Sequence, residues 1–129
     1  MENLRCQRIT LFCRNFTRWF LLVFTLLIIA FAMLSGAEGY GGGFKGVIQN
    51  APNALPWLLL LIINLIVWKS ELAGSIILIV FAIAAGFFFG AFTDNLFALF
   101  VITIPLIILA IMLMMYHTCQ MRQKKVIEN

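Results

Sequence analysis

The residues of this chain that could carry chemistry are few and scattered. The chain contains one histidine, His117, and three cysteines, Cys6, Cys13 and Cys119. A metal site needs several ligands in register, and a nucleophile needs a neighbouring base that activates it. No nucleophile, base and orienting group converge in the sequence, so we expect neither an enzyme nor a cofactor or metal site. His117 is then interpreted as a residue of the membrane interface.

Four apolar stretches make up most of the chain and must position whatever polar groups it has. Of its residues, 64% are hydrophobic and 11% are charged, against roughly 45–50% apolar and about 25% charged residues in soluble domains. About 20 consecutive apolar residues are enough for a helix to cross a bilayer. The sequence predicts an all-α transmembrane four-helix bundle with spans at about 19–35, 52–68, 72–92 and 96–116.

The basic residues predict the orientation of these spans. Only one of the nine, Lys45, falls on the second side of the predicted spans. The others fall together on the first side: Arg5, Arg8, Arg14, Arg18, Lys69, Arg122, Lys124 and Lys125. Because basic residues near span ends stay in the cytoplasm, we expect a multi-pass protein of a cell (inner or plasma) membrane with both termini cytoplasmic. The expected partner of the positive charge is the anionic lipid bilayer and not nucleic acid.

The two ends of the chain flank the membrane domain 19–116. Segment 1–18 is basic and is either an amphipathic helix at the interface or a disordered tail, and 117–129 is a basic cytoplasmic tail. The first span also imitates a signal peptide that ends before Glu38, but its apolar run of about 17 residues favours an uncleaved anchor. The cysteines of both ends are expected to be reduced thiols, either inert or, for Cys6 and Cys13, acylated.

Six glycines lie between residues 36 and 46 and predict a flexible connector on the outer side. The string matches no phosphate-binding glycine motif. After it, Pro52 predicts a helix start, and Pro56 predicts a bend or a second start. The span that follows is a plain short span with interfacial tryptophans or, alternatively, a re-entrant segment, and it contains one strongly polar residue, Asn64.

A tight hairpin joins the second and third spans. Trp68 and Lys69 suit the headgroup level, where the lysine can extend its ammonium toward phosphate groups. Ser70 can cap the next helix, and Glu71 in the first turn meets the positive end of the helix dipole. Glu38, at the end of the first span, is the matching interfacial residue of the opposite side.

A row of small residues predicts how the third span packs. Gly74, Ala82, Gly86 and Gly90 recur at multiples of four residues and form one face of a helix. In lipid, close approach along small residues provides packing contact between helices, and a residue such as Asn64 can add a hydrogen bond. This row, the small-residue seam, faces either another helix of the same chain or a helix of a second copy. In the fourth span, Pro105 predicts a kink.

Several of these features together resemble a family of small, uncharacterised four-span membrane proteins of bacteria and archaea. The resemblance covers about residues 16 to 117, and its most distinctive motifs are the Glu38-Gly39 pair and the hairpin. It rests on Arg18-Trp19, Gly36-Ala37-Glu38-Gly39, Trp68-Lys69-Ser70-Glu71-Leu72-Ala73-Gly74 and Pro105. The glycines 41 to 43 and the arginine-rich start depart from it. The resemblance implies a four-helix bundle in an inner membrane and no known activity.

Two functions from different classes are compatible with the residues. The first is a structural, accessory or assembly protein that binds other membrane spans. The second is a small channel or transporter that conducts as a homo-oligomer. Conduction routes usually contain ionisable residues deep within spans, whereas here such residues lie at or beyond span ends, and the interior polarity is limited to Asn64, Thr25, Ser75 and Thr103. The sequence therefore favours the accessory protein.

Overall fold

The computed structural model describes residues 2–128 and the side chains of residues 8–125. Its long helices are α1 (Glu2–Ser35), α3 (Leu55–Lys69), α4 (Glu71–Phe88) and α6 (Ile104–Glu128), and no strand occurs within residues 2–128. Four helical segments that include these helices are long and apolar enough to cross a membrane. The predicted all-α fold of a multi-pass membrane protein is confirmed.

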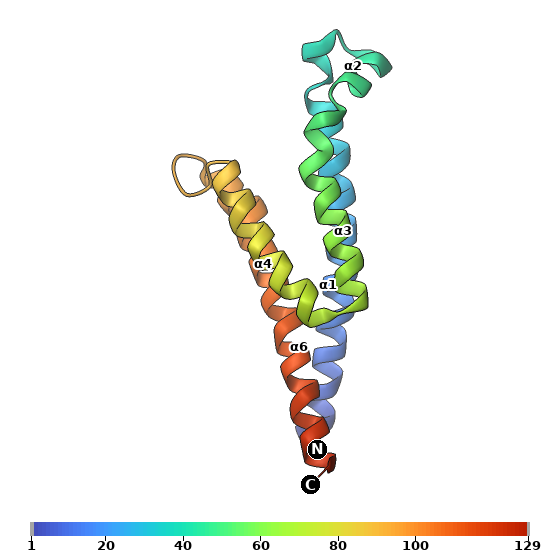
Figure 1. The fold of residues 1–129 in the computed structure, drawn as a ribbon, viewed down its shortest axis with the longest axis vertical. Coiled ribbons are helices and arrows are strands. Elements are labelled where there is room, and N and C mark those ends of the chain that lie inside the picture. Colours follow the sequence, from blue (N-terminus) through green and yellow to red (C-terminus); the bar gives the residue numbers. More distant parts are fainter. Residues whose placement is uncertain (1, 129) are drawn as a thin grey trace.

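Each of the four long helices packs against two others: α1 packs against α3 and α6, and α4 packs against the same two helices. Figure 1 shows both chain ends at one end of the molecule, α2 at the opposite end, and the α3–α4 hairpin about halfway between them. As a result, α1 and α6 continue past the hairpin as a pair. We call this pair, residues 2–17 of α1 and 117–128 of α6, the stalk.

Above the hairpin, the α1–α3 pair and the α4–α6 pair diverge (Figure 1). At the narrow end, a Cβ atom on Gly74 of α4 would lie 2.6 Å from the Cα atom of Val67 in α3, so the two backbones touch. At the wide end, Trp57 of α3 is 5% exposed and stacks on Phe89, with ring centroids 5.3 Å apart. The core stays continuous along the diverging helices. Gly74 allows close contact at the narrow end, and the large rings of Trp57 and Phe89 fill the space at the wide end.

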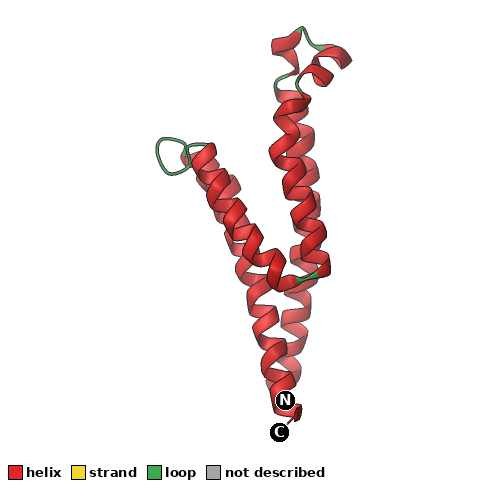
Figure 2. Ribbon diagram, viewed as in Figure 1, coloured by secondary structure: helices red, strands yellow, loops and turns green. Residues whose placement is uncertain are grey.

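The start of the chain is helical, as one of the two sequence alternatives expects. Helix α1 is a single helix of 34 residues, and Figure 2 shows it as an unbroken coil from the chain end to the outer loops. From Glu2 onward, segment 1–18 is therefore part of α1 and not a disordered tail. Its position at the membrane interface stays a prediction. No glycine or proline interrupts residues 2–35. Within the stalk, α1 packs against α6, and this packing stabilises the helix beyond the membrane span. Met1 lies outside the described residues.

The glycine-rich connector is more ordered than predicted. It forms η1 (Ala37–Tyr40), α2 (Gly43–Gln49) and η2 (Ala51–Ala54). Asn50, which is 1% exposed, donates hydrogen bonds from Nδ2 to the carbonyl oxygens of Ala32 and Met33, at 2.8 and 2.9 Å. These carbonyls belong to the last turn of α1, where backbone carbonyls begin to lack partners within the helix. A single buried amide thus ties the connector to the end of α1.

We expect Asn50→Ala to loosen this connector. The substitution removes two part-buried hydrogen bonds to carbonyls of α1, and leaving a fully buried group unsatisfied costs about 1–3 kcal/mol. The free energy of unfolding in detergent should fall by about that amount, and amide exchange in residues 36–54 should accelerate. Gln49→Ala, at an exposed neighbouring position, is the control and should change neither quantity. Equal exchange in the two variants would show that Asn50 does not anchor the connector.

The second hairpin also departs from the predicted bounds. Helix α4 ends at Phe88 and not at Phe92, and Gly90 lies after it with φ +67°. Asn95 caps the short helix α5 (Leu96–Ala98) by accepting a hydrogen bond from the Ala98 N–H at 3.1 Å. Gly90 is thus a turn residue outside the small-residue seam.

The irregularity expected at Pro105 takes the form of a π-helical turn. The turn η3 (Leu99–Thr103) precedes α6, which begins one residue before Pro105. A proline cannot donate the backbone hydrogen bond of its position, and its ring collides with the carbonyl four residues earlier. The wider π turn relieves both effects. Pro56, for which the sequence predicts a bend or a second start, lies in the first turn of α3, so a new helix begins there.

Candidate functional site

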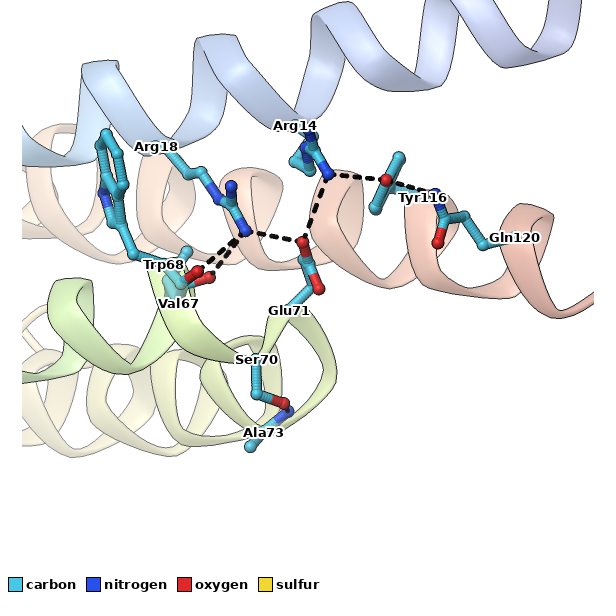
Figure 3. A network of polar contacts seen from close by, with 9 residues as sticks. All are labelled: Arg14, Arg18, Val67, Trp68, Ser70, Glu71, Ala73, Tyr116 and Gln120. Atoms are coloured by element: carbon cyan, nitrogen blue, oxygen red, sulfur yellow. Dashed lines mark hydrogen bonds and ion pairs between the residues drawn. The ribbon is translucent and has the colours of Figure 1, made fainter.

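Arg18 joins α1 to both sides of the α3–α4 hairpin (Figure 3). Its Nη2 atom donates to the Glu71 Oε1 atom at 2.6 Å and to the carbonyl oxygens of Trp68 and Val67 at 3.1 and 3.4 Å. The carbonyls close the C-terminal end of α3, where a positive charge is favourable, and Glu71 opens α4, where a negative charge is favourable. One guanidinium therefore satisfies the end of one helix and positions the beginning of the next.

Arg14, one turn earlier on the same face of α1, extends this cluster to α6 (Figure 3). Its Nη1 atom donates to the Tyr116 hydroxyl at 2.8 Å and lies 3.8 Å from Glu71 Oε1. The guanidinium also lies 4.9 Å from the centroid of the Tyr116 ring, within the range of a cation–π contact. The Gln120 amide donates to the same hydroxyl. All four long helices thus meet in one polar cluster, which we call the hairpin network.

The hairpin network is partly buried. The side chains of Arg18, Glu71 and Arg14 are 14%, 21% and 26% exposed. Restricted access to water strengthens the attraction between the charges and also raises the penalty for removing one of them. Two arginines and one glutamate leave an excess of one positive charge. Because these groups are occupied with one another, the arrangement supports positioning of helices rather than proton transfer to a substrate.

A pair of exposed tryptophans lies beside the hairpin network. Trp19 and Trp68 contact each other edge to face, with ring centroids 5.4 Å apart, and are 59% and 42% exposed. Exposed tryptophans in a multi-pass protein are typical of the lipid headgroup level, and the exposed Lys69 lies beside them in the sequence. Of the predicted interfacial residues, Trp68, Lys69 and Glu71 therefore lie together, and Glu38 lies exposed in η1, near the opposite end of the molecule.

The small-residue seam packs within the chain. Gly74, Ala82 and Gly86 are all buried. A Cβ atom on Gly86 would lie 2.6 Å from the Phe92 ring and 2.9 Å from the Thr103 hydroxyl, and Gly74 contacts α3 as described above. Both glycines thus permit contacts inside one copy of the protein. Of the two alternatives for this face, the contacts observed are those with helices of the same chain.

In the described part of the chain, no hydrogen bond joins the buried polar residues of the spans to one another, and the Thr103 hydroxyl has no partner there. Thr25 and Ser75 each donate to a carbonyl of their own helix, at 2.6 and 2.8 Å. Asn64 is 1% exposed, and its Oδ1 atom has no hydrogen-bond partner among the described residues. No group of three or more His, Cys, Asp and Glu side chains gathers in that part of the chain. Cys13 and Cys119 are half-buried, and the side chain of Cys6 lies outside it.

The sequence contained a signal for the hairpin network that was interpreted differently. By sequence pattern alone, Arg14 and Arg18 indicate topology, and Tyr116 ends a span. Arginines four residues apart share one face of a helix, and an acidic residue stands at the start of a neighbouring helix. These facts indicate a possible ion pair, but a pairing between residues 53 apart requires the helix register, which the sequence did not supply.

Comparison with known proteins adds a family assignment. No curated protein and no solved structure matches the chain. A family model described as "Domain of unknown function (DUF7670)" matches residues 6–128, which include the hairpin network and most of all four long helices. The predicted membership of an uncharacterised family is confirmed, and the bacterial or archaeal range stays a prediction. The chain belongs to the DUF7670 family, whose function is unknown.

Proposed function

We propose that the chain is a structural or accessory protein of a cell membrane, which binds other membrane spans and catalyses no reaction. The observation that carries this proposal is the internal use of the charged groups. Arg14, Arg18 and Glu71 bind one another and helix ends of the same chain. The outer surface of the spans is apolar and rich in aromatic residues, which suits contact with lipid and with other helices.

The proposed orientation places the stalk in the cytoplasm. The stalk contains Arg8 and the basic residues Arg122, Lys124 and Lys125, and the hairpin contains Lys69. Lys45 belongs to α2, at the opposite end of the molecule (Figure 1). The positive-inside rule then supports a bilayer between the tryptophan pair and the outer connector, with both termini cytoplasmic. The excess positive charge of the hairpin network lies on that same side.

A channel or transporter is the second candidate, and Asn64 is the observation in its favour. A buried amide oxygen without a partner is unfavourable by about 1–3 kcal/mol, and polar residues inside spans can line a route for a substrate. In the accessory proposal, the same residue is merely a tolerated core position. The two proposals therefore predict different results for one substitution.

For Asn64→Leu we expect normal or increased stability, because a side chain of similar volume replaces an unsatisfied polar group. The midpoint of thermal unfolding in detergent should stay equal or rise, and the yield of any complex extracted from the membrane should not change. Leu65→Ala, at the adjacent position that is 65% exposed, is the control. Ion flux through liposomes containing the native chain that disappears in Asn64→Leu would contradict the accessory proposal and favour the channel.

A further inference from the structure

The face of α1 opposite to the hairpin network carries four stacked phenylalanines. Phe12, Phe16, Phe20 and Phe24 follow one another at intervals of four residues, with centroid separations of 6.1, 5.5 and 6.0 Å. The exposed fraction is 41% at Phe20, 45% at Phe16 and 70% at Phe12. We call these four residues the aromatic ladder. The ladder runs from the half-buried Phe24, which packs against the core, to increasingly exposed rings in the stalk.

The aromatic ladder extends further than lipid can cover it. Trp19 and Trp68 lie at the headgroup level, and Phe24 lies about 8 Å to the membrane side of Trp19, at 1.5 Å per residue. Phe12 lies about 10 Å to the other side of Trp19. The headgroup region of one leaflet is only about 5–8 Å thick. Phe12 therefore projects into water, where an exposed stretch of aromatic surface indicates a binding site for a protein.

The charge of the stalk restricts the kind of protein that fits. Arg8 is exposed and lies four residues before Phe12, so it continues the line of the aromatic ladder. The charged side chains described in the stalk are all basic: Arg8, Arg14, Arg122, Lys124 and Lys125. A second copy packed in parallel along the ladder would bring its own Arg8 against this one. A partner with acidic residues at that level would be attracted instead.

We propose that the aromatic ladder binds a helix of a different membrane protein, one that crosses the bilayer beside Phe20 and Phe24 and continues into the cytoplasm as an acidic helix beside Phe12 and Arg8. This inference rests on the proposed accessory function and names the class of partner. The apolar contacts supply the helix-packing surface across the headgroup level. The basic residues select the partner by charge and make binding sensitive to salt.

The test is photocrosslinking of the full chain in its native membrane. Phe12→p-benzoylphenylalanine places the reactive group in the aromatic ladder. Phe97→p-benzoylphenylalanine is the matched control, because Phe97 is 74% exposed but belongs to α5 and not to α1. After irradiation, mass spectrometry identifies the linked peptide. We expect position 12 to link to an acidic segment next to a membrane span of one other protein. Adding the surface substitution Arg8→Glu should reduce the yield by about fivefold, as loss of a favourable charge contact predicts.

The remaining outcomes separate failure of this inference from failure of the proposed function. Links from position 12 to a second copy, to lipid alone or to a segment that is not acidic would overturn the inference. A link to another protein from position 97 together with none from position 12 would overturn it too, while leaving the accessory function in place. Absence of a link to any protein from both positions would count against both. Unchanged thermal unfolding of Arg8→Glu verifies that the substitution acts on binding and not on folding.

Discussion

Gly74→Leu is expected to separate α3 from α4 and to destabilise the protein more than any other single change at the hairpin. The Cβ atom of any larger residue at this position would lie 2.6 Å from the Cα atom of Val67. A backbone atom cannot move aside as the end of a side chain can, so the helices themselves must shift. Overpacking in a well-packed core typically costs 1–3 kcal/mol, and we expect about 3 kcal/mol or more here.

The measurement for Gly74→Leu is reversible unfolding in mixed detergent, followed by the fluorescence of the tryptophans. Ala73→Leu is the matched control, because Ala73 is exposed on the neighbouring position of α4. It adds the same side chain on the lipid side and should leave stability nearly unchanged. Equal stability of Gly74→Leu and Ala73→Leu would show that α3 and α4 do not meet at Gly74, and the arrangement of the hairpin would then be wrong.

Glu71→Ala is expected to have the second largest effect. It leaves the guanidinium groups of Arg14 and Arg18 partly buried without their carboxylate, and removal of one partner from a buried pair typically costs about 3–5 kcal/mol. Since the three side chains keep 14–26% of their surface in water, we expect the lower part of this range. The stalk should also loosen, because Arg14 connects Glu71 to α6.

A double-mutant cycle separates the pair from the individual residues. The free energy of unfolding is measured for Glu71→Ala, for Arg18→Met and for the combination, and the double variant should lose clearly less than the sum of the two single losses. Glu38→Ala is the control, since Glu38 is exposed in η1, and it should be nearly neutral. Losses that simply add would mean that Arg18 and Glu71 do not interact.

The sequence was sufficient for the features that depend on local composition. The apolar stretches gave four helices that can cross a membrane, since their length and hydropathy decide this without knowledge of packing. Ser70 was correctly predicted as the cap of α4, because its Oγ atom accepts a hydrogen bond from the Ala73 N–H at 3.4 Å. The Ser70 cap and the acidic residue in the first turn of α4 are local features, which can be recognised within a few residues of sequence.

The features that the sequence did not reveal depend on contacts between distant residues. The hydropathy of residues 8–17 contains no information on whether α6 runs alongside them, and this packing is what continues α1 into a stalk. The glycine-rich connector is ordered by Asn50, whose partners lie 17 and 18 residues earlier. Gly90 matched the seam by spacing, but α4 ends two residues before it. The pairing of Arg18 with Glu71 depends on how α1 packs against the α3–α4 hairpin.

Native mass spectrometry after mild extraction from its own membrane shows whether this chain binds another membrane protein, as we propose. The spectrum reports the stoichiometry and the identity of every chain that remains bound. We expect a reproducible complex of fixed stoichiometry with one different membrane protein. Asn64→Leu should leave this complex intact, and Phe12→Ser combined with Phe16→Ser should weaken it. A closed homo-oligomer without another protein, or a bare monomer, would contradict this proposal.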